Sequence, residues 1–122
     1  MAYEIRQWPA AVRREIGGLP GPAEAAVLVL LIAMRARGPR PEEYQVKPLK
    51  KNLRGLVQVN MKINREQIRV LFSVYGNCIV VFHVFKKTSP QVELRGYELA
   101  LKRKKTAEQI TKGGADELPT LH

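Results

Sequence analysis

Basic side chains gather at three places in the 122-residue chain where they could bind phosphate groups. They are Arg69 in an alternating segment, the pair Lys86 and Lys87 after a long apolar run, and the cluster of Lys50, Lys51 and Arg54. Arginine can hold a phosphate through two parallel hydrogen bonds, and lysine adds a compact positive charge. A solvated surface explains each group equally well when it is taken alone. Three such groups in one small domain favour RNA or DNA as the ligand.

His83 is the one histidine that falls inside a predicted element of the fold. It can serve as a proton donor and acceptor, or it can be a core histidine held by hydrogen bonds, and both interpretations stay open. Carboxylates are poorly placed to assist it, since Glu42 and Glu43 fall in a proline-containing loop and no acidic pair has metal-ligand spacing. Cys78 lies on the opposite face of the same predicted strand, so it cannot pair with His83.

A residue set of arginine, lysine and histidine limits the chemistry to reactions that need no metal. RNA carries its own nucleophile, because the 2′-hydroxyl can attack the adjacent phosphate in line. The protein then has to supply cations for the developing charge and a donor for the leaving 5′-oxygen. DNA lacks that hydroxyl, so the residues fit RNA better than DNA.

Charge is distributed unevenly along the chain. The net charge is +10, from 21 Lys and Arg against 11 Asp and Glu, and the basic excess lies in residues 35–105. Residues 1–34 are balanced, and residues 106–122 are acidic. A positive field of this kind attracts polyanions, most often nucleic acid, although an acidic protein partner is also compatible with it.

Length and composition exclude several classes of protein. One domain is expected at residues 1–111, followed by a flexible tail at 112–122. A single cysteine rules out an internal disulfide framework, so a cytoplasmic location is expected. The longest apolar run, residues 25–34, would span about 15 Å as a helix, whereas a membrane requires about 30 Å. No metal or cofactor motif is present, and none is expected to bind.

Hydrophobic periodicity predicts an α+β domain. Strand patterns occupy residues 3–8, 56–61, 67–74 and 78–85, and helical patterns follow Pro9, Pro22 and Pro90. Gly76-Asn77 predicts a tight hairpin between the last two strands. The order predicts a small antiparallel sheet with two N-terminal helices and a C-terminal helix packed on it.

Two further expectations concern burial. The helix after Pro22 is apolar nearly all round, so it should be largely buried. In the strand at 67–74, alternation places Ile68, Val70 and Phe72 on the core face. Arg69 then points to the opposite face, which is expected to be open.

Residues 22–106 resemble toxins of the RelE/ParE superfamily, and most closely the HigB-like, phage-derived branch of type II toxin–antitoxin systems. The resemblance rests on Lys47-Pro48-Leu49, on the strand at residues 67–72, and on His83 to Thr88 followed by Pro90. It implies a RelE-like fold and a metal-independent endoribonuclease that cuts mRNA, usually on the ribosome. It also implies a helix-turn-helix antitoxin as partner.

The resemblance assigns roles to residues. Arg69, Lys86 and Lys87 would contact the scissile phosphate or stabilise the transition state, with His83 as a proton-transfer group. Apart from the resemblance, we expect the basic residues Lys47, Lys50, Lys51 and Arg54 to dock on mRNA or 16S rRNA. Two alternatives remain, a ParE-like gyrase inhibitor without RNase activity and a non-catalytic nucleic-acid-binding accessory domain.

Overall fold

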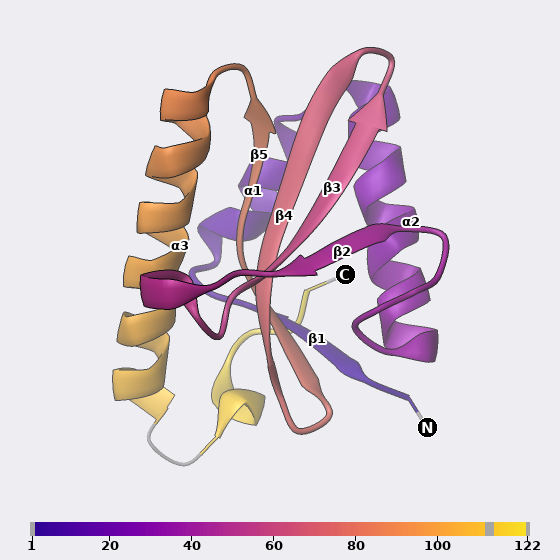
Figure 1. Cartoon of the computed structure of the whole chain (residues 1–122). Helices are drawn as coiled ribbons and strands as arrows, with labels where there is room; N and C mark the ends of the chain where they lie inside the picture. Colours follow the sequence, from indigo (N-terminus) through magenta and orange to yellow (C-terminus); the bar gives the residue numbers. More distant parts are fainter. Residues whose placement is uncertain (1, 112–113, 122) are drawn as a thin grey trace.

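The computed structural model describes residues 2–111 and 114–121 and is built on a sheet of five strands (Figure 1). The spatial order is β1-β5-β4-β3-β2. The strands are β1 (Glu4–Gln7), β2 (Gln45–Pro48), β3 (Val57–Ile63), β4 (Glu66–Tyr75) and β5 (Cys78–Lys87). The hairpin predicted at Gly76 and Asn77 is confirmed, since Tyr75 pairs with Cys78 and Gly76 has a φ of +62°.

Helices cover both faces of this sheet. They are α1 (Ala11–Gly17), α2 (Gly21–Arg37) and α3 (Pro90–Thr111), with short 3-10 turns η1 (Lys51–Leu53) and η2 (Ala115–Glu117). The helices α1 and α2 pack on one face, around Ile68, Val70 and Phe72. The helix α3 packs on the other face, where Ala100 and Ala107 meet Leu71, Val80 and Phe82. The predicted α+β architecture is confirmed.

The sheet is mixed rather than antiparallel throughout. β1 pairs with β5 in parallel, with Ile5 opposite Ile79. A tight turn requires its two strands to run antiparallel, but no such turn joins β1 to its neighbour. Two helices and the rest of the sheet separate them in sequence, so β1 is free to join the edge of β5 in either direction.

The helix α2 is only half buried, which corrects the expectation from its composition. Val27, Leu30 and Met34 face the sheet and are fully buried, whereas Val29 and Ile32 face solvent. The sheet covers one side of α2, and nothing in the described chain covers the outer side. Within residues 2–111 and 114–121, the helices are too short or too polar for any of them to cross a membrane.

The segment after α3 is packed and not loose over residues 114–121. Leu118 and Leu121 are buried, and the Leu121 amide donates to the Ile5 carbonyl at 2.8 Å. The Gln7 amide likewise donates to the Pro119 carbonyl at 2.9 Å. The reason is that β1 lies at the edge of the sheet and offers unpaired backbone groups. Of the predicted flexible tail, residues 112, 113 and 122 lie outside the described residues.

Close packing of α3 on β5 depends on the absence of a side chain at Gly96. A Cβ atom added there would lie 2.4 Å from the Cζ atom of Phe85. We therefore expect Gly96→Ala to lower the free energy of unfolding by about 1–3 kcal/mol, although alanine is the better helix former. Urea unfolding measures this. Gly21→Ala is the control, because no heavy atom lies within 4 Å of its added Cβ. Equal stability of Gly96→Ala and wild type would contradict the packing described.

Candidate functional site

Strand register gathers polar side chains on the sheet face beneath α3. One cross-strand row consists of Gln45, Asn60, Arg69 and Phe85, and the next consists of Lys47, Gln58, Leu71 and His83. Arg69 and His83 therefore lie on the same face of neighbouring strands, as required if they act together. Between them lies Phe85, whose ring stacks on the His83 ring at 4.8 Å between centroids.

Arg69 is covered, which corrects the expectation of an open sheet face. Only 6% of the residue is exposed. Its Nε donates to Glu93 Oε2 at 2.9 Å, and its Nη2 donates to Gln67 Oε1 at 2.9 Å. The helix α3 begins just after β5 ends, and its first turns lie back over this part of the sheet. A buried guanidinium needs such a partner, since an unpaired charge is costly away from water.

The Glu93 carboxylate lies where several donors converge. Besides Arg69, the Nζ atom of Lys87 lies 3.5 Å from Glu93 Oε1, and the Tyr97 hydroxyl also hydrogen-bonds to it. Burial raises the pKa of Glu93, but Arg69 and Lys87 outweigh that effect and the pKa lies below its usual value. We call Arg69, Lys87 and Tyr97 the anion site. In this structure a carboxylate of the same chain fills it.

The adjacent residues Lys86 and Lys87 face opposite sides of the sheet. Lys86 pairs with Ile68 across the strands and faces the side of α1 and α2, where its Nζ donates to Glu66 at 2.8 Å. Lys87 pairs with Gln67 and faces the side of Arg69. This agrees with the alternation of a strand, which allows only one of two neighbours to join Arg69.

His83 has a carboxylate partner, Glu15, that no sequence motif predicts. Its Nδ1 lies 3.0 Å from Glu15 Oε1, although 68 residues separate the two in sequence. The Val84 amide donates to the same oxygen at 3.1 Å, and Arg103 Nη1 donates to Glu15 Oε2 at 2.8 Å. The view that carboxylates are poorly placed is therefore wrong for Glu15. No local motif signals the pair, because α1 and β5 meet only in the folded chain.

Electrostatics keep Glu15 ionised. Burial raises the pKa of this carboxyl, but the hydrogen bond and charge of His83, followed by the hydrogen bond from Arg103, outweigh it and hold the pKa below its usual value. A carboxylate on Nδ1 orients the imidazole and leaves the other ring nitrogen for proton transfer. Glu15 is thus a positioning residue for His83.

The predicted docking residues lie on the surface beside α3. Lys50, Lys51 and Arg54 are exposed on the loop around η1. Leu49 and Leu53 anchor that loop in the apolar cluster beneath α3. Lys47 is exposed on β2, at the edge of the sheet. This loop adjoins α3, because a Cβ atom added at Gly55 would lie 3.0 Å from the Lys104 Cε atom, so the loop and the helix form one surface.

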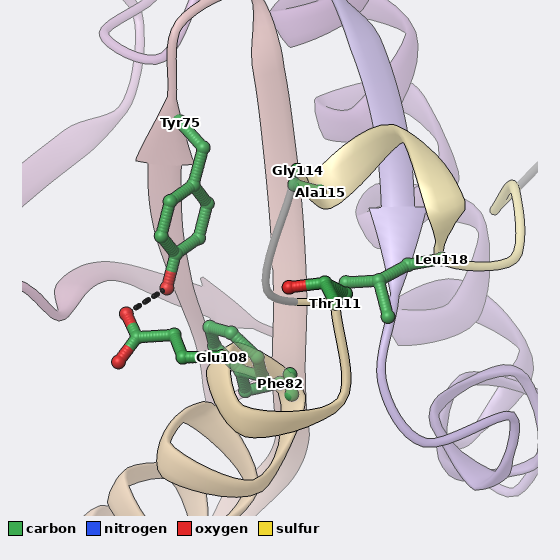
Figure 2. A pocket seen from close by; sticks show the side chains of 8 residues that line it. Tyr75, Phe82, Glu108, Thr111, Gly114, Ala115 and Leu118 are labelled. Atoms are coloured by element: carbon green, nitrogen blue, oxygen red, sulfur yellow. Dashed lines mark hydrogen bonds between the residues drawn. The ribbon is translucent and has the colours of Figure 1, made fainter.

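A separate cavity of about 330 Å³ lies at the far end of α3 (Figure 2). Phe82, Ala107 and Leu118 line it, and the Tyr75 hydroxyl at its wall donates to Glu108 Oε2 at 2.7 Å. Burial and the neighbouring carboxylate raise the pKa of Tyr75, so its hydroxyl keeps its proton. None of the predicted site residues lines this cavity, and it shares no lining residue with the anion site.

Comparison with known proteins identifies the family. The family model for phage-derived Gp49-like proteins (DUF891) matches residues 4–105. The chain belongs to the Gp49-like family. The predicted resemblance to the phage-derived branch is confirmed at this level. Among curated proteins, none matches the chain.

Two solved structures share the fold of this Gp49-like chain. A chain of the RelBE2 toxin–antitoxin complex of Mycobacterium tuberculosis is 24% identical, with a TM-score of 0.54, and the match covers 71% of this chain and 100% of that one. A double arginine-to-alanine mutant of the E. coli toxin RelE in the free state is 16% identical, with a TM-score of 0.55. That match covers 80% of this chain and 97% of RelE. The RelE-like fold is therefore confirmed.

The partnership of Glu15 with His83 and Arg103 predicts a pH dependence of stability. Because folding lowers the pKa of Glu15 from its usual 4.5, the ionised form stabilises the fold above that pH. This contribution is lost as the pH falls through the folded-state pKa. We expect Glu15→Gln to lose less stability than wild type between pH 7 and about pH 3. Denaturant unfolding at each pH measures this. Glu98→Gln, on the exposed side of α3, should follow wild type. If the free energy of unfolding depended on pH in the same way for Glu15→Gln and wild type, the proposed link between Glu15 ionisation and stability would be refuted.

Proposed function

We propose that this Gp49-like protein is the toxin of a toxin–antitoxin system and cleaves mRNA without a metal ion. The observation that carries the proposal is the anion site of Arg69, Lys87 and Tyr97 beside a carboxylate-oriented histidine on one face of the sheet. The shared fold adds support, since one structure with this fold is a toxin–antitoxin complex and another is the toxin RelE.

In the proposed reaction the RNA supplies its own nucleophile. The 2′-oxygen forms a bond to phosphorus, the bond from phosphorus to the 5′-oxygen breaks, and a 2′,3′-cyclic phosphate and a 5′-hydroxyl result. One proton leaves the 2′-oxygen and one reaches the 5′-oxygen, and His83 carries one of these transfers. Arg69 and Lys87 stabilise the charge that develops on the phosphate oxygens.

The scissile phosphate binds where the Glu93 carboxylate now lies. Both groups are anions with oxygen acceptors, so Arg69 and Lys87 can exchange one for the other. The carboxylate must move aside for this exchange, so it competes with RNA. Lys86 has no part in the chemistry proposed here, because it faces the opposite side of the sheet.

The basic loop positions the RNA. Lys47, Lys50, Lys51 and Arg54 contact the sugar–phosphate backbone of mRNA or of 16S rRNA, and supply affinity without reading the bases. The protein acts in the cytoplasm on ribosome-bound mRNA. A helix-turn-helix antitoxin is its proposed inhibitor.

Arg69 provides the direct test of the proposed activity. Inducing the wild-type chain should arrest growth and leave mRNA cuts that primer extension detects. Arg69→Ala should lower the cleavage rate by about a hundredfold or more, because it removes a phosphate-binding cation. Cleavage by the purified protein should persist in EDTA. Circular dichroism confirms that the variant is folded, and Arg69→Lys should retain part of the activity.

Two outcomes would contradict this function. Cleavage that EDTA abolishes would exclude the metal-free reaction. Growth arrest with intact mRNA and a DNA-damage response would favour a gyrase inhibitor instead.

Glu93 provides a second test, because its removal should open the anion site. We expect Glu93→Gln to bind single-stranded RNA about threefold to tenfold more tightly, since one competing anion is lost. A 2′-O-methyl oligonucleotide allows binding to be measured by fluorescence anisotropy without cleavage. Glu66→Gln is the matched control, because Glu66 neutralises Lys86 on the other face. An equal gain of RNA affinity in both variants would show that only net charge matters. It would argue against an exchange of the Glu93 carboxylate for an RNA phosphate.

A further inference from the structure

The outer side of α2 carries a second apolar face that the described chain leaves uncovered. Leu28, Val29 and Ile32 are 38%, 56% and 69% exposed. Ala25 and Ala36 are exposed as well. These positions are three or four residues apart, so they form one stripe along the helix. We call them the outer stripe. An apolar patch on the outside of a small protein marks a site of contact with another molecule.

A groove runs alongside the outer stripe. Its volume is about 640 Å³, and its walls come from α2, from β1 and from the C-terminal segment. The side chains that form it are largely apolar, among them Ile5, Leu28, Leu31, Ile32 and Leu121. The stripe and the groove together can accept large apolar side chains from a partner.

Arg35 is the charged side chain that lines the groove. Arg37, two residues further along α2, pairs with Glu43 at 2.7 Å, and Arg6 on β1 pairs with Glu4. Within the described residues no carboxylate lies within ion-pair distance of the Arg35 guanidinium. Its surroundings therefore combine an apolar floor with one unpaired positive charge.

We propose that the outer stripe and its groove bind an acidic amphipathic helix of a partner protein. Apolar side chains of that helix, spaced at three and four residues, would fill the groove, and a carboxylate would pair with Arg35. From Ala25 to Ala36 the stripe is about 16 Å long, which matches about three turns of the partner helix. The net charge of +10 favours an acidic partner over a second copy of this chain.

The proposed surface is distinct from the proposed RNA site. The helix α2 packs on the sheet face opposite to the one that holds Arg69 and His83. A helix bound to α2 would therefore leave the anion site uncovered. The inference goes beyond the proposed function and does not depend on RNA cleavage.

The test uses a labelled helical peptide of about 16 residues, with leucine at positions spaced three and four apart and glutamate on the flanks. Fluorescence anisotropy gives its affinity for the full chain. We expect Ile32→Arg and Arg35→Glu each to weaken binding by about tenfold or more. Lys51→Glu, on the basic loop, makes the same charge change as Arg35→Glu. It should change the affinity for the peptide by less than about twofold. A peptide with lysine in place of glutamate should bind about tenfold more weakly than the acidic peptide.

Three results would overturn the proposal. The first is failure of the acidic peptide to bind. The second is an equal loss of peptide affinity in Lys51→Glu and Arg35→Glu. The third is a dimer of this chain, seen in sedimentation measurements, that Ile32→Arg dissociates. The last result would assign the stripe to a second copy. RNA cleavage by the same preparations is scored separately, so a failure here is distinguishable from failure of the proposed function.

Discussion

The unpaired edge of β5 beyond Val81 determines where the charged groups of the site lie. β1 ends at Gln7, opposite Val81, so the next residues of β5 have free backbone groups on one side. Glu15 accepts the Val84 amide, and Arg103 donates to the Phe82 carbonyl at 2.8 Å. These bonds join α1 and α3 to the same stretch of strand, and they hold Glu15 and Arg103 beside His83. A buried backbone group left without a partner is costly, so the edge and the charged cluster stabilise each other.

Local patterns in the sequence were sufficient for most of the elements. Alternation in β3 and β4, the continuous apolar run of β5 and the Gly76-Asn77 turn each depend on neighbouring residues, and all were predicted correctly. The same alternation required that only one of Lys86 and Lys87 share the face of Arg69, but the strand register was needed to show that it is Lys87. The parallel pairing of β1 and the contact between Glu15 and His83 join distant segments, and no local pattern specifies them.

The sequence of α3 contains a pattern that indicates the burial of Arg69, although the overall composition of the chain does not show it. Gly96, Ala100 and Ala107 are small and lie on one side of the helix, which allows its backbone to approach the sheet closely. That approach brings Glu93 onto Arg69. A strand cation that faces a helix with small residues on that side is therefore a candidate for a buried ion pair with the helix. The affinity of such a cation for an external anion then depends on the strength of the internal ion pair that the external anion has to replace.

The C-terminal segment that packs along β1 also bears on how the protein behaves in a crowded solution. Exposed strand edges invite strands from other chains, and this addition starts aggregation. Hydrogen bonds from Gln7 to Pro119 and from Leu121 to Ile5 occupy the edge at β1. At the other edge β2 carries Lys47 and Pro48, a charge and a residue without an amide hydrogen. Both margins of the sheet therefore discourage intermolecular strand addition, which allows the free protein to persist as separate molecules while its apolar helix face stays exposed.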